Sequence, residues 1–184
     1  MQLAVNIIIY QICWLACIIS AAKLQPLIGV GLVTIAAGYH LYTARDSLPE
    51  LKLLLIAAIV GAAWDSLPVA MGWLVYPSGM VLESAAPYWI VALWVVFATT
   101  FNVSLRWFKQ RLLLASLFGA IGGPLAFLAG ERLGGVEFVD YPMAIGALAI
   151  GWGVLMPLML VIADRFNGFV DAESTAPASA GQGV

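Results

Sequence analysis

The stretch Leu51–Trp73, LKLLLIAAIVGAAWDSLPVAMGW, decides the fold class of this chain. As a helix it is long enough to cross the hydrocarbon layer of a membrane, which takes about 20 apolar residues. Asp65 lies about 20 Å along such a helix from Leu51, at a rise of about 1.5 Å per residue. A carboxylate at that depth costs several kcal/mol unless it is paired, protonated or hydrated. The stretch therefore predicts a membrane helix with one acidic residue that needs a partner.

The rest of the chain has the same apolar character. Hydrophobic residues make up 63% of its 184 residues and charged residues 10%, against about 45–50% and 25% in soluble domains. The pattern predicts an all-α membrane protein, a bundle of six transmembrane helices that fills residues 1–165. Residues 166–184 are mostly small and polar, and we expect a disordered cytoplasmic tail there. The six expected spans are 5–22, 25–43, 50–73, 87–107, 111–130 and 142–163.

The basic residues predict how the bundle is oriented. An even number of spans places both termini on one side, and only Lys23 and Arg132 fall on the other side. Because cytoplasmic loops are rich in lysine and arginine, we expect both termini in the cytoplasm and a multi-pass protein of the bacterial inner membrane. The net charge of −2 gives no reason to expect nucleic-acid binding. The basic residues on the terminal side are Arg45, Lys52, Arg106, Lys109, Arg111 and Arg165.

Two interpretations of Asp65 remain open from the sequence. Small residues share its side of the helix, so it is expected to face protein. One interpretation is a structural carboxyl that accepts hydrogen bonds from the Trp152 indole, from Ser66, or from amides freed where Gly122-Gly123-Pro124 interrupts the fifth helix. The other is a proton-accepting or substrate-orienting group in an internal cavity. Asp65, Trp152 and Ser66 are therefore the candidate intramembrane site.

A second polar group is predicted near the cytoplasmic face. Asn102 and Arg106 are one helical turn apart, and His40 and Asn6 lie at a similar depth on other helices. One interpretation is a pocket for a lipid headgroup or an acyl carboxylate, with Arg106 as the anion partner. The alternative is that Arg106 extends to lipid phosphates while Asn102 ties helices together.

The sequence also argues against several kinds of chemistry. A single histidine and the absence of His-x-x-His spacing disfavour a metal centre, and Cys13 and Cys17 are expected to be packing residues. No nucleophile elbow, phosphate loop or dinucleotide loop is present. We therefore expect no metal and no cofactor, and a binding protein more than an enzyme. An enzyme using Asp65 as general base would lack a visible nucleophile. Ser47-Leu48-Pro49-Glu50 predicts a capping box that starts the third helix.

Several segments between residues 5 and 165 carry a resemblance. They are Gln11-Ile-Cys-Trp14, Trp64-Asp65-Ser66-Leu67, Leu93 to Asn102 with Ser104-Leu-Arg106-Trp107, and Gly119-Ala-Ile-Gly-Gly-Pro124 to Gly130. They resemble a family of small bacterial inner-membrane proteins classed as a domain of unknown function, family 2878. The resemblance implies a part in membrane lipid modification, and it brings no catalytic residues with it.

Two functions follow as hypotheses. The first is an accessory or lipid-binding component of membrane fatty-acid or lipid modification. Its expected partners are membrane lipids, with a cytoplasmic lipid-modifying enzyme as a further candidate. The alternative is a small proton-coupled transporter or permease, in which Asp65 takes up the proton and the fifth helix lines the site.

Overall fold

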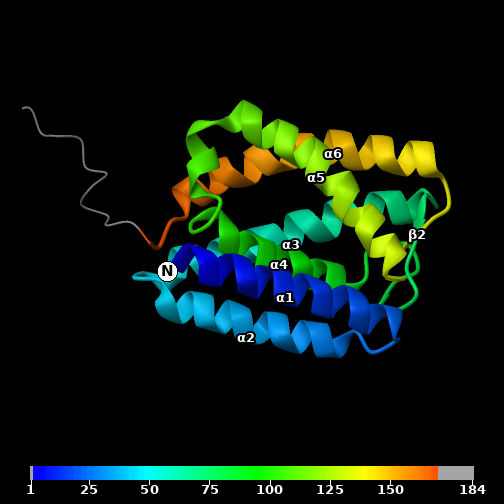
Figure 1. The fold of residues 1–184 in the computed structure, drawn as a ribbon, viewed down its shortest axis with the longest axis horizontal. Coiled ribbons are helices and arrows are strands. Elements are labelled where there is room, and N and C mark those ends of the chain that lie inside the picture. Colours follow the sequence, from blue (N-terminus) through cyan, green and yellow to red (C-terminus); the bar gives the residue numbers. More distant parts are fainter. Residues whose placement is uncertain (1, 170–184) are drawn as a thin grey trace, which may run out of the picture.

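A computed structural model describes residues 2–169 (Figure 1). The predicted all-α class is confirmed, since helices account for about three quarters of this part and its only strands are two short ones of two residues each. In chain order the elements are α1 (Gln2–Ala22), α2 (Leu27–Thr43), α3 (Ser47–Ala70), β1 (Leu74–Val75), α4 (Tyr88–Phe101), the 3₁₀ helix η1 (Arg106–Gln110), α5 (Leu112–Arg132), β2 (Glu137–Phe138) and α6 (Tyr141–Arg165).

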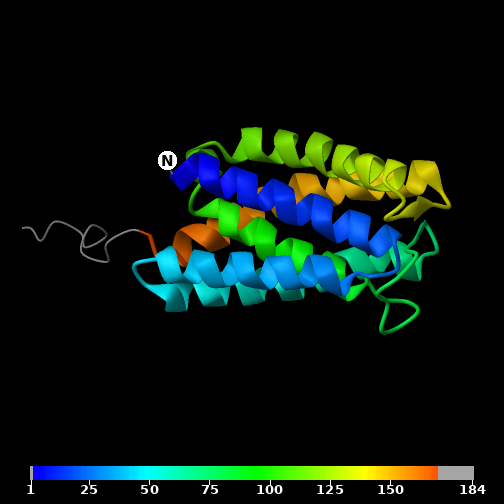
Figure 2. The same cartoon turned by 60° about the horizontal axis from the view of Figure 1, so that its bottom comes forward.

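The six α-helices run alternately in opposite directions along one long axis. Figures 1 and 2 show α1 and α2 side by side at one edge of the bundle and α5 and α6 side by side at the other. Helices α3 and α4 pack on each other between these pairs, and α4 contacts α1, α2 and α6. The start of α1 and the end of α6 therefore lie at the same end of the bundle (Figure 1).

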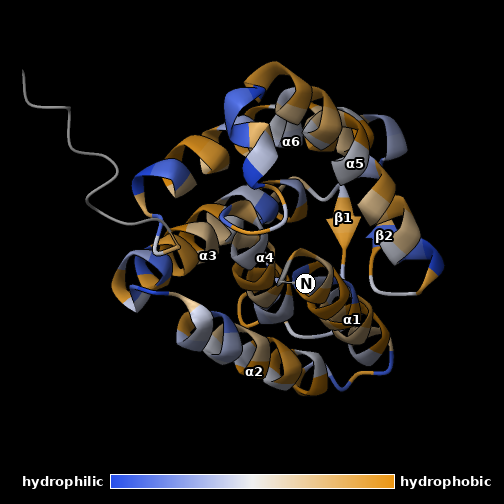
Figure 3. Ribbon diagram, turned by 60° about the vertical axis from the view of Figure 1, so that its left-hand side comes forward, coloured by the Kyte–Doolittle hydropathy of each residue, from blue (hydrophilic) through white to orange (hydrophobic). Residues whose placement is uncertain are grey.

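The outer surface of the bundle is apolar. Side chains such as Ile35, Ile59, Leu113 and Ile150 are each at least 70% exposed, and Figure 3 shows polar residues gathered mainly at helix ends and connections. Exposed apolar area of this extent is what a membrane-facing surface requires. Four helices, α1, α3, α5 and α6, are long and apolar enough to cross a membrane, whereas α2 and α4 are apolar but shorter. These features are those of a membrane protein.

The fourth helix is shorter than predicted. The sequence predicts a helix over 87–107, but α4 ends at Phe101 and the chain then forms turns and η1. Polar side chains account for the early end, because Thr100 donates to the carbonyl of Phe97 at 2.6 Å and Asn102 is held by groups on other helices. Such side-chain bonds offer the backbone an alternative to continuing the helix.

The start of α3 differs from the predicted capping box. The cap is Asp46, whose carboxylate accepts from the amide of Leu48 at 3.1 Å, an arrangement favoured at helix starts. Glu50 does not fold back onto the helix start; it points into the bundle. The prediction was wrong because the capping pattern uses local spacing alone, and Glu50 has stronger partners on distant segments.

The first residues of the predicted disordered tail are ordered. Residues 166–169 are packed against the bundle, with the amide of Gly168 donating to Glu50 at 2.8 Å and the Phe169 ring 5.2 Å from the His40 ring. The remaining part of that prediction, residues 170–184, lies outside the described residues.

Candidate functional site

Asp65 is one of the most deeply buried polar residues of the bundle. It lies on α3, with 1% of its surface exposed. Its Oδ2 atom accepts a hydrogen bond from the indole Nε1 of Trp94 at 2.7 Å. Its Oδ1 atom is also buried and has no hydrogen-bond partner among residues 2–169. One carboxylate oxygen of Asp65 is thus hydrogen-bonded within the described chain, and the other is available to a ligand or a water molecule.

The donor to Asp65 differs from the one predicted. Trp152 does not donate to it, and neither does Ser66, whose hydroxyl donates to the carbonyl of Ala62 and accepts from the amide of Ala86. The predicted break at Gly122-Gly123-Pro124 is not seen either, because α5 runs through it from Leu112 to Arg132. Trp152 nevertheless lies close by, since its ring stacks on that of Trp94 at 4.7 Å and 11°.

Three tryptophan rings of this region pack directly against glycines. A Cβ atom on Gly61 would overlap the Trp94 ring, one on Gly123 would overlap Trp152, and one on Gly151 would overlap Trp64. Glycine lets large rings approach a neighbouring helix closely, as small residues do in membrane bundles. Gly61 lies one turn before Asp65, so the same feature that admits the Trp94 ring also brings its N–H to the carboxylate.

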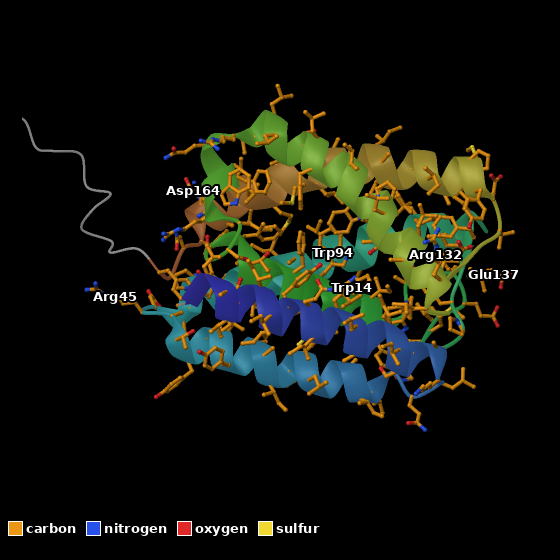
Figure 4. All side chains as sticks on the ribbon, in the orientation of Figure 1. Trp14, Arg45, Trp94, Arg132, Glu137 and Asp164 are labelled. Atoms are coloured by element: carbon orange, nitrogen blue, oxygen red, sulfur yellow. The ribbon has the colours of Figure 1, made fainter. Side chains whose placement is uncertain are left out.

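Asp65 lines a cavity of about 80 Å³ whose wall is mostly aromatic. Two further buried polar atoms belong to its lining residues and have no partner in the described part of the chain: the Tyr76 hydroxyl and the Trp152 Nε1. Figure 4 shows Trp14 and Trp94 in the interior, away from the charged residues labelled at the two ends of the bundle. The lining residues are Tyr10, Trp14, Ile18, Asp65, Tyr76, Trp89, Ile90, Leu93, Trp94, Phe97, Ala126, Phe127, Gly130, Val136 and Trp152.

The two connections at the far end of the bundle close this cavity. They pair as an antiparallel two-stranded sheet, with Leu74 opposite Phe138 and Val75 opposite Glu137. Tyr76, which follows β1, and Val136, which precedes β2, both line the cavity. Burial raises the pKa of Tyr76 well above its ordinary value, and the nearby Asp65 carboxylate raises it further. Tyr76 is therefore a neutral hydroxyl that can donate a hydrogen bond.

A second, larger cavity adjoins the first. It measures about 340 Å³ and lies between α1 and α5, with α4 and α6 behind it. The two cavities share Tyr10, Phe97, Ala126 and Trp152. We call the larger one the α1–α5 groove. Its lining is largely apolar: Ile7, Tyr10, Gln11, Phe97, Thr100, Ser104, Leu105, Phe118, Gly119, Gly122, Gly123, Ala126, Trp152 and Met156.

The second polar group is organised around Glu50, which sequence analysis did not identify. Glu50 is completely buried. Its carboxylate pairs with His40 Nε2 at 2.8 Å and accepts from Asn102 Nδ2 at 2.6 Å and from the amide of Gly168 at 2.8 Å. Asn102 also donates to the carbonyl of Phe166 at 2.9 Å. This cluster joins α2, α3, the end of α4 and the segment after α6.

The four residues predicted for this pocket do not meet in one place. His40 and Asn102 meet through Glu50. Asn6 lines a cavity of about 100 Å³ together with His40, but its side chain is held by other groups, donating to the carbonyl of Thr99 at 3.1 Å and accepting from Ser104 at 2.6 Å. Arg106 is exposed at the start of η1 and makes no hydrogen bond or ion pair with residues 2–169. The structure therefore gives Arg106 no anion-binding role in a shared pocket.

Lys109, rather than Arg106, is the basic residue at the Glu50 cluster. Its Nζ donates to Asn102 Oδ1 at 2.7 Å and pairs with Asp164 at 3.3 Å. Partial burial lowers the pKa of Lys109 below its ordinary value, an effect opposed by Asp164 and by Glu50. The cluster thus combines two carboxylates, one amine, one imidazole and one side-chain amide, which hydrogen-bond to one another as a structural network.

One sequence signal would have found Glu50. The buried residues of α3 include Glu50, Leu54, Ala57, Gly61 and Asp65, each three or four positions from the next. Residues with this spacing share one face of a helix. Following the face of Asp65 back toward the start of the helix therefore leads to Glu50. Trp94 carries a weaker signal, since a tryptophan in the middle of an apolar helix needs a buried acceptor for its N–H.

The side chains around the Asp65 cavity define what the site can bind. Its lining is mostly aromatic, and the buried polar atoms without a partner within residues 2–169 are one carboxylate oxygen, one hydroxyl and one indole N–H. The described residues contain no group of three side chains that would hold a metal ion. Within them the cavity lining has no serine, cysteine, histidine or lysine that would serve as a nucleophile or base beside Asp65. The arrangement is suited to holding a molecule in the bundle.

Comparisons with known proteins identify the family and nothing more specific. A model of DUF2878, described as a protein of unknown function, matches residues 3–158. None of the curated proteins compared, and none of the solved structures, matches the chain. Because the family match covers most of the sequence, and in agreement with the resemblance found from the sequence, the chain belongs to the DUF2878 family.

Proposed function

We propose that this protein is a lipid-binding component of membrane lipid modification, and that it holds a lipid tail in the α1–α5 groove. The observation that carries the proposal is the groove itself: an apolar space of about 340 Å³ between two helices that are apolar on their outer surfaces. Pockets for small molecules have volumes of about 300–1,000 Å³. A flexible hydrocarbon chain is the occupant that the surrounding membrane supplies.

The groove is placed where a lipid would reach it. Its rim includes Ile7 and Phe118, which are 47% and 50% exposed, on α1 and α5. Gly122 leaves the wall of α5 open, because a Cβ there would meet only Phe118, at 3.9 Å. A tail entering from the side would therefore pass between two helices without displacing a packed side chain.

The membrane setting belongs to the same proposal. We take all six helices as spans of a bacterial inner membrane, with both termini on the cytoplasmic side. The rule that cytoplasmic loops are rich in lysine and arginine supports this orientation. On that side the exposed Arg106 and Arg111, with Trp107, form a basic and aromatic surface around η1 where a cytoplasmic lipid-modifying enzyme would dock.

A second candidate function is a small proton-coupled transporter. The unpartnered Oδ1 of Asp65 beside a cavity is the observation that favours it, since buried acids in membranes often carry protons. This candidate predicts that Asp65→Asn abolishes proton-dependent uptake while the protein remains folded. Unchanged uptake in that variant would eliminate the transporter.

The lipid proposal is tested by filling the groove. Gly122→Phe places a ring in the groove, and Gly146→Phe is a matched control, because a Cβ on Gly146 would meet nothing within 4 Å and Gly146 does not line the groove. Native mass spectrometry with lipid analysis of the purified proteins gives the readout. We expect a retained lipid in the wild type and in Gly146→Phe, and its loss in Gly122→Phe. Equal retention in all three proteins would contradict the proposal.

A further inference from the structure

We propose that the Asp65 cavity binds an organic ammonium group, so that the ligand of the α1–α5 groove is a long-chain amine. The placement of the tail rests on the proposed function above. The recognition of the ammonium group rests on separate observations at the Asp65 cavity.

The first observation is that the cavity lining contains an acidic side chain and no basic one. Asp65 Oδ1 is buried and unpartnered within the described chain, while Oδ2 is already bonded to Trp94. None of the residues that line the cavity is a lysine, arginine or histidine. A buried carboxylate is stabilised by an opposite charge, and the described residues that line this cavity do not supply one. A bound cation would donate to Oδ1 and complete the pair.

The second observation is the aromatic wall. Trp14, Trp89, Trp94 and Trp152 line the cavity together with Tyr10 and Tyr76. The faces of aromatic rings attract ammonium groups, and tryptophan does so most strongly. Aromatic rings around one carboxylate form the type of site that recognises organic cations, because the ring faces attract the positive charge.

The third observation concerns size and the choice among lipids. The cavity of about 80 Å³ suits a small polar head, and it continues into the larger groove through Tyr10, Phe97, Ala126 and Trp152. A phosphate would find no basic side chain in the lining of either cavity. A fatty-acid carboxylate would lie against the carboxyl group of Asp65, with no basic side chain in the described lining to neutralise it. An amine on a hydrocarbon chain is the amphiphile that both cavities accept.

The unpartnered donors refine this ligand. The Tyr76 hydroxyl and the Trp152 Nε1 are buried and have no acceptor within residues 2–169. Each would be satisfied by an oxygen of the ligand or by a water beside the ammonium group. Buried polar groups are rarely left without partners. A bound ligand would give partners to these two donors.

The test uses the full-length protein in nanodiscs of neutral lipid. Tryptophan fluorescence is titrated with dodecylamine, dodecanol and dodecanoate, which share one tail and differ in head charge. A short amine, ethylammonium, probes the cavity without the groove. We expect dodecylamine to bind at least about tenfold more tightly than dodecanol, and dodecanoate to bind most weakly.

Three variants make the result specific. Asp65→Asn retains an acceptor for Trp94 but removes the charge, so the preference for the amine should disappear while dodecanol binding stays within about twofold. Glu83→Gln, at an exposed acidic residue in a loop, is the matched control and should retain the preference. Trp14→Leu removes one aromatic face and should weaken amine binding while leaving the carboxylate in place.

The outcomes separate this inference from the proposed function. Equal binding of amine and alcohol to the wild type overturns the ammonium site, and so does a preference that survives in Asp65→Asn. If alcohol and amine bind equally but both are lost in Gly122→Phe, the groove stands without the amine. If ethylammonium binds in an Asp65-dependent way and Gly122→Phe changes nothing, the ammonium site stands without the groove. The wild-type series is decisive even if a variant folds poorly.

Discussion

Replacing Glu50 by alanine should release the segment after α6 and destabilise the bundle. The carboxylate is completely buried and has three partners, His40, Asn102 and the amide of Gly168. Each buried polar group left unsatisfied costs about 1–3 kcal/mol. The His40 ring loses its partner, and the side-chain nitrogen of Asn102 keeps only its bond to the carbonyl of Phe166. The Gly168 amide lies near the chain end, where water can replace the lost bond.

The contributions of His40 and Asn102 together predict a loss of about 2–6 kcal/mol in the free energy of unfolding. Glu50→Gln should cost only about 1 kcal/mol, because its amide oxygen still accepts from Asn102 and Gly168 and its amide nitrogen faces His40. Unfolding in mixed micelles with increasing denaturing detergent measures both values. Glu83→Ala, at an exposed loop residue, is the matched control.

A second readout distinguishes the local release from a general loss of stability. Phe166 and Phe169 flank the Gly168 contact with Glu50. Chymotrypsin should therefore cleave the end of the chain faster in Glu50→Ala than in the wild type, under conditions where the bundle remains folded. If Glu50→Ala changes the free energy of unfolding by less than about 0.5 kcal/mol, as an ordinary surface substitution does, the described network does not hold the bundle together.

Three further predictions follow from the packing and the charges. Asp65→Leu should destabilise the bundle by about 1–3 kcal/mol, because Trp94 Nε1 loses its acceptor. Asp65→Asn keeps an acceptor and should be tolerated. Similar unfolding curves for the two variants would contradict this difference. Gly61→Ala should cost about 1–3 kcal/mol through overlap with the Trp94 ring, and Gly31→Ala, where a Cβ meets nothing within 4 Å, should be neutral or slightly stabilising in the same assay. Partial burial lowers the pKa of Lys109 in the folded protein, so the unfolded chain keeps that proton to higher pH. The free energy of unfolding should therefore rise with pH just below 10.5, the ordinary pKa of lysine. Lys109→Met should reduce that rise.

The sequence predicted the helices well because hydrophobic periodicity and length are local properties. It placed the start of α3 within a few residues and found Asp65 from its depth alone. It misplaced the end of α4, because Thr100 and Asn102 form side-chain hydrogen bonds that a hydropathy pattern does not register. Their effect depends on which residues lie opposite, and that information is not local.

The candidate site was predictable only in part for the same reason. Trp152 was predicted to donate to Asp65, but the donor is Trp94. Trp94 reaches Asp65 because Gly61, which has no side chain, lets its ring pack closely against α3. Glu50 was assigned to a cap because its spacing fits a local motif, although its partners lie on other segments. The cavities are lined by residues of several helices, and no pattern within one helix encodes how the helices are spaced.

The most direct test of the central claim, that a lipid tail occupies the α1–α5 groove, is photo-crosslinking with a lipid that carries a diazirine near the end of its tail. Mapping the adducts by mass spectrometry should locate them on the facing residues Ile7 and Gln11 of α1 and Gly122 and Ala126 of α5. Gly122→Phe should remove these adducts. Labelling spread evenly over outer residues such as Ile35 of α2, and unchanged in Gly122→Phe, would show that lipid only surrounds the bundle and would contradict the account.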